Sequence, residues 1–168
     1  MCGLTGIYCS TYSENLVEKV SKMTSVLSHR GPNDKGIWFD QNIALGHRRL
    51  AILDLSVSGA QPMKSECGRY VLVYNGEIYN HLNIRNKLNI EGIAPKWRGH
   101  SDTETLLAAI KSWGLEKALT ETHGMFALAL WDKKMKTLSL ARDRMGEKPL
   151  YWGWAGKDFI FGSELKAL

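Results

Sequence analysis

The segment between residues 125 and 162 most constrains the fold, because it contains four short stretches typical of β-strands. They read MFALALWD, TLSLAR, LYWGW and DFIFG, and tight polar turns join them. These strands meander without the regular strand–helix alternation of a parallel sheet, so they indicate antiparallel pairing. The pattern therefore predicts an α+β fold with antiparallel sheets and helices packed outside them.

The remaining segments supply further strands and the helices. LTGIYC (residues 4–9) and NIALGHRRLAILDL (42–55) are predicted to be extended, with His47 and Arg49 on one face and Arg48 on the other. Helical spacing of apolar residues predicts a helix that begins near residue 16 and stops at Gly31-Pro32. RYVLVYNGEIYN is interpreted as a hairpin with an Asn-Gly turn.

Two more helices are predicted nearer the end of the chain. SDTETLLAAIKSWG has the capping pattern S-x-x-E in Ser101 and Glu104, and Gly114 suits its carboxyl end. SELKAL at residues 163–168 is interpreted as the start of a helix. The six tryptophans fall mostly in these strand and helix patterns, so they are expected in the core: Trp38, Trp97, Trp113, Trp131, Trp152 and Trp154.

Composition limits the classes of protein that fit. The 168 residues suit one domain, and no apolar stretch approaches the length of a membrane span. The net charge of +5 is scattered among acids, which gives little support for nucleic-acid binding. Cys2, Cys9 and Cys67 contain no CxxC pair, so we expect no disulfide framework, no zinc or other metal site, and a reducing, cytoplasmic setting.

Cys2 lies directly behind the initiator methionine. If Met1 is removed, the α-amino group of Cys2 comes within reach of its own sulfur. Ordinary pKa values of about 8.5 for a thiol and roughly 7.7–8.0 for an α-amine are closely matched, so proton transfer between them costs only about 1 kcal/mol. Cys2 is therefore a candidate nucleophile with a built-in base. The alternative is a small apolar residue that opens a strand.

Three further features have both a structural and a chemical interpretation. Asn75-Gly76 fits a hairpin turn, but a carboxamide and a glycine N–H can also form an oxyanion hole. Asp102 suits the first turn of a helix electrostatically, but it can also bind an ammonium group. Arg49 is either an exposed strand residue or a bidentate ligand for a carboxylate. Together with a thiol, these groups complement an amino acid with a side-chain amide, and glutamine is the obvious candidate.

Nine stretches carry a resemblance to a known family. In order they are MCGLTGI, HRGPND, GHRRLAILDL, QPM, YNGEIYN, SDTETLL, HGMFALALWD, ARDRMGEKPLYW and FGSELKAL. Over essentially the whole chain the sequence resembles the class II glutamine amidotransferase domain, the amino-terminal half of the asparagine synthetase family. The resemblance implies the N-terminal nucleophile hydrolase fold, in which two antiparallel sheets lie between helical layers (αββα).

The resemblance also implies roles for individual residues. Cys2 would form a γ-glutamyl thioester and release ammonia, with Asn75 and Gly76 as the oxyanion hole. The implied substrate-binding residues are Arg49 for the α-carboxylate, Asp102 with Glu77 for the α-amine, and Leu50, Ile52 and Leu53 as pocket wall. Arg30, Gly31 and Pro32 would shape the loop near the nucleophile. Asn33 stands where the family commonly has Asp, with Asp34 next.

Relatives in this family continue into a second domain that this sequence does not contain, since it has no SGGxDS-type loop and no Walker-type motif. The resemblance thus implies a glutaminase domain over residues 1–168 that needs no cofactor, whereas ATP and magnesium would act in the absent synthetase domain. The expected partners are L-glutamine and that domain, not nucleic acid or membrane, with homodimerisation left open. Aspartate is the default acceptor of ammonia.

Several alternatives stay open at this point. The ammonia acceptor can instead be a sugar uronate or another carboxylate in surface-polysaccharide biosynthesis. A glutamine-binding regulatory domain without turnover would keep the same fold. A hydrolase of another amide fits less well, because an acyl chain offers no zwitterion for Arg49 and Asp102.

Overall fold

The computed structural model describes residues 1–11, 14–51 and 56–168. Its strands are β1 (Gly3–Tyr8), β2 (Asp34–Asp40), β3 (Ile43–Arg49), β4 (Met63–Lys64), β5 (Tyr70–Ile78), β6 (Gly124–Asp132), β7 (Thr137–Arg142), β8 (Tyr151–Ala155) and β9 (Asp158–Gly162). Its α-helices are α1 (Leu16–Val26), α2 (His81–Ile90), α3 (Asp102–Trp113) and α4 (Leu115–Glu121), and short 3₁₀ turns cover Val57–Gly59 and Leu165–Ala167.

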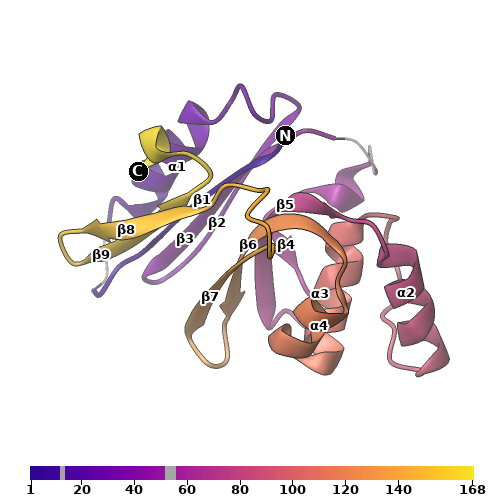
Figure 1. Ribbon diagram of the computed structural model, residues 1–168. Helices are drawn as coiled ribbons and strands as arrows, with labels where there is room; N and C mark the ends of the chain where they lie inside the picture. Colours follow the sequence, from indigo (N-terminus) through magenta and orange to yellow (C-terminus); the bar gives the residue numbers. More distant parts are fainter. Residues whose placement is uncertain (12–13, 52–55) are drawn as a thin grey trace.

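The strands form two antiparallel sheets. Sheet A has the order β2-β3-β1-β9-β8, and sheet B has the order β4-β5-β6-β7. Helix α1 lies on the outer face of sheet A, and α2, α3 and α4 lie on the outer face of sheet B (Figure 1). The arrangement is the four-layer αββα architecture, so the predicted fold class is confirmed.

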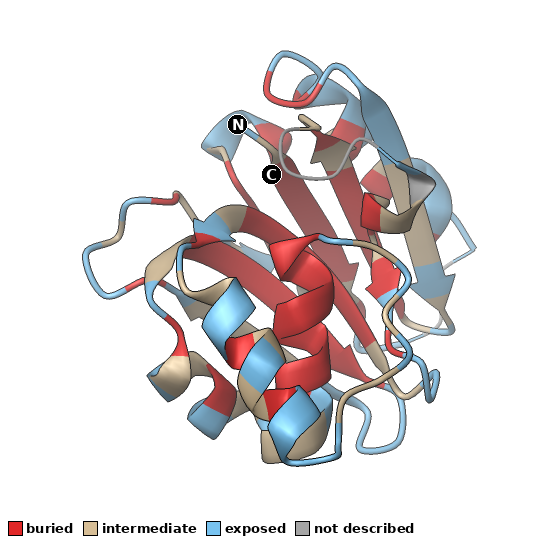
Figure 2. Cartoon of the chain, turned by 90° about the vertical axis from the view of Figure 1, so that its right-hand side faces the viewer, coloured by how far each residue is buried: buried red, intermediate tan, exposed pale blue. Residues whose placement is uncertain are grey.

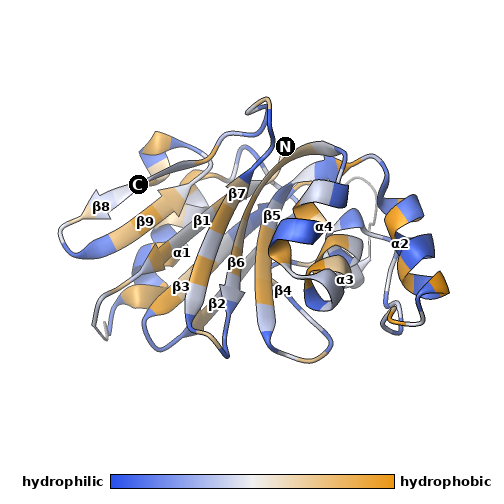
Figure 3. Cartoon of the chain, turned by 60° about the horizontal axis from the view of Figure 1, so that its bottom comes forward, coloured by the Kyte–Doolittle hydropathy of each residue, from blue (hydrophilic) through white to orange (hydrophobic). Residues whose placement is uncertain are grey.

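Each interface between layers has its own hydrophobic cluster. The cluster between the two sheets includes Leu4, Leu45, Val73 and Trp131. The largest cluster joins sheet B to its helices, and a smaller one joins α1 to sheet A. Figure 3 shows the hydrophobic stretches along β5 and β9 that feed these clusters. Because successive side chains of a strand point to opposite faces, each central strand contributes to two clusters.

Helix α3 is the most deeply buried helix, as Figure 2 shows. Its first turn is capped as predicted, since the Ser101 hydroxyl accepts a hydrogen bond from the Glu104 N–H at 3.2 Å. Gly114 ends the helix with φ +84°, a backbone conformation that favours glycine. The Glu104 carboxylate reaches back beyond the cap and accepts from the backbone N–H groups of Arg98 and Gly99.

The predicted Asn-Gly hairpin is wrong. Strand β5 runs without a turn from Tyr70 to Ile78, and it pairs with β6 along its whole length. Gly76 serves close approach instead, because a Cβ there would lie 2.3 Å from the Met125 carbonyl oxygen of the neighbouring strand. The glycine is therefore required by the packing of two strands and not by a turn.

Two other expectations need correction. Trp131 is buried, but Trp152 and Trp154 on the edge strand β8 are 63% and 67% exposed. Sheet A has five strands and sheet B has four. Strand β8, which carries both of these tryptophans, is an edge strand of sheet A. The terminal SELKAL segment forms only a single 3₁₀ turn within the residues described.

Candidate active site

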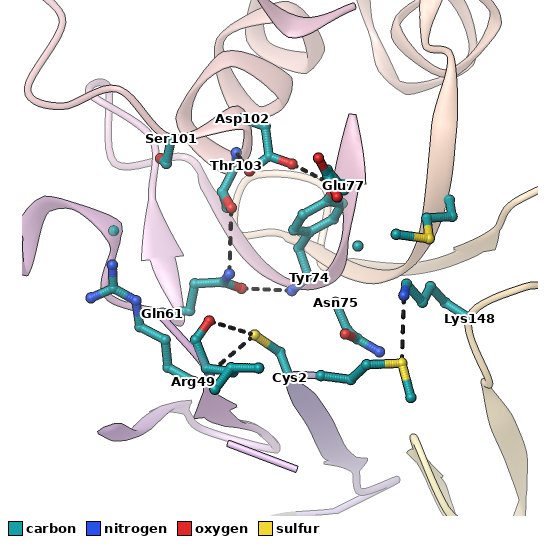
Figure 4. A pocket seen from close by; sticks show the side chains of 15 residues that line it. Cys2, Arg49, Gln61, Tyr74, Asn75, Glu77, Ser101, Asp102, Thr103 and Lys148 are labelled. Carbon is teal, nitrogen blue, oxygen red and sulfur yellow. Dashed lines mark hydrogen bonds between the residues drawn. The ribbon is translucent and has the colours of Figure 1, made fainter. Parts of the chain in front are cut away.

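The two sheets enclose a pocket of about 110 Å³ at one end of the space between them. Figure 4 shows its wall at close range. The lining residues come from the two residues before β1, from β3, β5, β6 and α3, and from the connecting loops: Met1, Cys2, Arg49, Leu50, Gly59, Gln61, Tyr74, Asn75, Gly76, Glu77, Ser101, Asp102, Thr103, Met125 and Lys148. Segments that are far apart in the sequence thus meet at one point.

The pocket forms where the rows of inward side chains change from apolar to polar. Leu45 on β3 and Val73 on β5 belong to the cluster between the sheets. Two residues further along each strand, on the same face, lie His47 and Asn75. Both are buried, and the His47 Nε2 lies 3.0 Å from the Tyr74 carbonyl oxygen, so it donates to that oxygen across the sheets. The strand alternation that builds the core therefore also places His47 and Asn75 on the faces that the two sheets turn towards each other.

The Cys2 sulfur lies in the pocket and contacts the backbone of Leu50, the residue directly after β3. It accepts a hydrogen bond from the Leu50 N–H at 3.3 Å and lies 3.6 Å from the Leu50 carbonyl oxygen. The Cys2 carbonyl oxygen accepts from Arg30 Nε at 3.0 Å. Arg30 also binds Glu164 at 2.8 Å, and this hydrogen bond is the main cause that lowers the Glu164 pKa to about 2. Hydrogen bonds thus hold the candidate nucleophile Cys2 at both its sulfur and its carbonyl oxygen.

Asn75 and Gly76 present hydrogen-bond donors to the same pocket. In β5 the N–H groups of Tyr74 and Ile78 point away from β6, because they donate to Gln61 and Asp102 side chains. Strand geometry makes the Gly76 N–H point the same way, into the gap between them. The Asn75 Nδ2 is buried and has no hydrogen-bond partner among the residues that the structure describes.

A buried amide N–H without an acceptor costs free energy of about 1–3 kcal/mol, so its retention here calls for an explanation. An incoming oxygen atom would satisfy both Asn75 Nδ2 and the Gly76 N–H. The sequence predicts that a turn brings the Asn75 and Gly76 donors together, whereas in the structure a continuous strand does so.

The charged residues lie at the other walls of the pocket. Arg49 is mostly buried and donates from Nη1 to the Ser56 carbonyl oxygen at 2.9 Å. Arg48 does not line the pocket, in agreement with its predicted opposite face. Asp102 accepts hydrogen bonds from the Tyr74 hydroxyl at 2.8 Å, and burial is the main cause that raises the Tyr74 pKa, with Asp102 adding to it.

Comparison with known proteins agrees with this geometry. The model of the family described as "Glutamine amidotransferase domain" matches residues 1–168. The chain belongs to this family. It is 39% identical to asparagine synthetase (glutamine-hydrolysing) 3 of Bacillus subtilis and 36% identical to asparagine synthetase B (glutamine-hydrolysing) of Escherichia coli. Each alignment covers 100% of this chain, but only 27% and 30% of the two relatives.

The solved structures confirm the fold of this amidotransferase domain. Glutamine phosphoribosylpyrophosphate amidotransferase from B. subtilis superposes with a TM-score of 0.83 over 99% of this chain and 42% of that chain, at 22% identity. The N-terminal nucleophile hydrolase fold expected from the resemblance is therefore confirmed.

Some predicted residues of the amidotransferase domain lie outside the pocket. Arg30 contacts Cys2 through its carbonyl, as described above, whereas Gly31 and Pro32 do not line the cavity. Gly31 is needed for close approach, because a Cβ would lie 2.3 Å from the Arg48 carbonyl carbon. Ile52 and Leu53 lie outside the described residues. Leu50 is the predicted wall residue that the structure places in the pocket.

Asn33, which departs from the family pattern, has a clear role. Its side-chain oxygen accepts a hydrogen bond from the Ala51 N–H at 3.1 Å, and its own N–H donates to the Arg49 carbonyl oxygen. An amide oxygen performs this acceptor role as well as a carboxylate oxygen can.

Sequence reasoning missed several lining residues of the amidotransferase domain. Gln61 accepts the Tyr74 N–H at 2.7 Å and lies beside Thr103. Its only sequence signal is the QPM stretch, which carries no chemistry by itself. Lys148 comes from the loop after β7 and was not separable from the other lysines by pattern. Among the described residues, no group of His, Cys, Asp or Glu has an arrangement that could hold a metal ion. In the same part of the chain, no helix has the length and apolar character needed to cross a bilayer.

Proposed function

We propose that this domain hydrolyses the side-chain amide of glutamine to glutamate and ammonia, with Cys2 as the nucleophile after removal of Met1. The observation that carries the proposal is the meeting of Cys2, Gly76 and Asn75 in one pocket, where the Asn75 Nδ2 has no partner among the described residues. This set supplies what acyl transfer needs: a nucleophile and donors for the oxygen that becomes negative.

In the first half-reaction the thiol proton passes to the Cys2 α-amino group, and the sulfur attacks the amide carbon. The carbonyl oxygen becomes an oxyanion that accepts hydrogen bonds from Asn75 Nδ2 and the Gly76 N–H. The α-ammonium group then donates a proton to the amide nitrogen, the C–N bond breaks, and ammonia leaves. A γ-glutamyl thioester on Cys2 remains.

In the second half-reaction a water molecule attacks the thioester while the α-amino group accepts its proton. The same two donors stabilise the second oxyanion. Collapse breaks the C–S bond, the sulfur regains a proton from the α-ammonium group, and glutamate leaves. The α-amino group of Cys2 thus accepts and returns the proton in both half-reactions.

The charged walls orient the substrate. Arg49 holds the α-carboxylate, and Asp102 with Glu77 holds the α-ammonium group, while Leu50 forms the adjacent wall. The Asp102 carboxylate is fixed by Tyr74, Ile78 and Thr103 before substrate arrives. This prior orientation reduces the entropy lost on binding.

In the whole protein, we infer that the ammonia serves an ATP- and magnesium-dependent synthetase domain, with aspartate as the acceptor. The support is that two glutamine-hydrolysing asparagine synthetases align with the whole of this chain. This chain spans about three tenths of their length. A carboxylate of a different acceptor would need the same ammonia, so the glutaminase proposal does not depend on this choice.

The test combines intact mass with a glutaminase assay on one sample. Protein that has lost Met1 should release glutamate from glutamine, and Cys2→Ala should reduce turnover to background while the circular dichroism spectrum stays unchanged. The matched control is Cys67→Ala, since Cys67 is exposed and does not line the pocket. Normal turnover by Cys2→Ala, or none by Met1-free wild type with glutamine at high concentration, would overturn the proposal.

A further inference from the structure

A second buried cation faces the pocket, and the reaction described above does not use it. Lys148 is 7% exposed and lines the pocket on the side of Cys2 away from Arg49 (Figure 4). Its ammonium group lies 3.5 Å from the Met1 sulfur. A thioether is a weak acceptor, so in the described part of the chain this buried ammonium has no strong partner. Buried charges are normally paired, which makes the placement informative.

The loop before Lys148 holds it firmly in place. The Asp143 carboxylate accepts hydrogen bonds from the backbone N–H groups of Phe126, Glu147 and Lys148. Although burial opposes it, these hydrogen bonds hold the Asp143 pKa below its ordinary value. The Arg142 guanidinium donates to the Lys148 carbonyl oxygen at 2.6 Å. These hydrogen bonds fix the backbone of Lys148 at N–H and C=O, so its side chain starts from a well-held turn beside the pocket.

Removal of Met1 would change what Lys148 faces. The Met1 sulfur is joined to the Cys2 nitrogen by only a few covalent bonds, so the ammonium lies within roughly 10 Å of that nitrogen. When Met1 leaves, the ammonium loses this contact, and the same nitrogen becomes a free amine. Both groups then face one partly buried pocket, where like charges repel more strongly than they do in bulk water.

We propose that the Lys148 ammonium keeps the Cys2 thiol–amine pair from taking up a second proton at neutral pH. The pair then retains the single proton that catalysis moves between sulfur and nitrogen. Lys148 is a positioning residue in this role, because it acts through the charge of the pair. The inference rests on the proposed function for its purpose, but its effect on the thiol can be measured without glutamine.

The other charges around the pair explain why a further cation is needed. Glu77 from β5 and Asp102 from α3 are anions that favour the doubly protonated pair. Arg49 from β3 opposes them. In the bound state the substrate carboxylate neutralises Arg49, and the substrate ammonium group neutralises the two acids. Arg30 is already paired with Glu164 and touches only the Cys2 carbonyl oxygen. Tyr74 stays neutral because burial and Asp102 raise its pKa. Of the cations that line the pocket in the described residues, Lys148 is the one that stays uncompensated while glutamine is bound.

The first test measures the rate at which iodoacetamide alkylates Cys2 in Met1-free protein between pH 5 and 9. Fragment-ion masses separate Cys2 from Cys9, which lie on one tryptic peptide ending at Lys19, and Cys67 lies on a different peptide. In Lys148→Met the pH of half-maximal rate should rise by about one unit, since the side chain keeps its bulk and loses its charge. Lys148→Arg should stay within about 0.3 units of wild type. The control is Lys157→Met in the exposed β8–β9 turn, and it should leave the profile unchanged.

The second test is the pH profile of kcat/KM for glutamine. Lys148→Met should lower activity about tenfold at pH 6 and little at pH 9, because the pair loses its second proton at high pH in either protein. An equal loss at every pH, or an unchanged alkylation profile, would overturn the role of Lys148. A shifted alkylation profile without glutamine turnover would instead support the effect of Lys148 on the thiol and overturn the proposed function.

Discussion

At the scale of single residues, polar side chains replace apolar ones next to the pocket, at the ends of the core rows. His47 and Asn75 follow Leu45 and Val73 on the same strand faces. The His47 Nε2 donates to the Tyr74 carbonyl oxygen, whereas the Asn75 Nδ2 has no partner among the described residues. Residue substitutions should therefore separate binding, chemistry and stability.

Arg49→Ala should raise the KM for glutamine, by tenfold or more, while kcat changes little. The reason is that the guanidinium binds a carboxylate that is the same in the ground state and the transition state, so its loss removes uniform binding. Steady-state glutaminase kinetics measure this. Arg48→Ala is the matched control, because Arg48 does not line the pocket. A fall in kcat at unchanged KM would contradict the assignment.

His47 should make the fold sensitive to mild acid. Burial is the main cause that lowers its pKa to about 4, from an ordinary value of 6.5. Between these values the unfolded chain binds a proton that the folded chain excludes, so the free energy of unfolding falls as pH drops from 6.5 to 4, by on the order of 3 kcal/mol. Urea unfolding at pH 7 and pH 5 measures the slope.

The matched variant is His47→Gln, which keeps a donor for the Tyr74 carbonyl oxygen and does not titrate. Its free energy of unfolding should change less with pH over this range, whatever its value at pH 7. Glu164, with its pKa lowered to about 2, contributes stability that is lost only below about pH 4.5 and does not interfere. An identical slope in both proteins would show that another group is responsible.

At the scale of elements, helix α3 was predicted well and strand β5 was not. The S-x-x-E cap and Gly114 are local signals, and the helix they bound is the one observed. The Asn-Gly pair in β5 is also a local turn signal, but β6 pairs with the whole segment and the pairing prevails. Tertiary contact overrides propensity most easily in strands, where the pairing residues are distant in sequence.

Ser101→Ala should lower the free energy of unfolding by about 1 kcal/mol, because the first turn of α3 loses its side-chain cap. Asp102 follows directly, so the KM for glutamine should rise together with the loss of stability. Urea unfolding and glutaminase kinetics check both effects. Ser112→Ala is the control, since its hydroxyl makes only a 3.5 Å contact near the end of the helix, and it should cost less than about 0.5 kcal/mol.

At the scale of the whole molecule, periodicity predicts the layers but not how they meet. Apolar spacing places each strand and helix in a layer, and the observed clusters follow it. The site depends on the offset between two sheets, which no local pattern contains. That is why Cys2 and Asn75 could be nominated from the sequence, while Gln61 and Lys148 could not. The tryptophans show the same limit, because sheet edges are not visible in a strand pattern.

Trp131→Ala and Trp154→Ala should differ sharply in stability. Trp131 is buried between the sheets, so its truncation should cost about 3–5 kcal/mol. Trp154 is 67% exposed, and its truncation should cost about 1 kcal/mol or less. Thermal or urea unfolding of the two variants measures the difference. Equal losses would mean that the open face of β8 is covered in solution.

Strand β4 is only two residues long and pairs with β5 solely at Leu72 and Val71. A longer β4 would continue along β5 and give the Gly76 N–H a permanent carbonyl partner. Such a change would make the sheet more regular and would leave an arriving oxyanion one donor short. An extension of β4 that stabilises the domain should therefore lower its glutaminase activity.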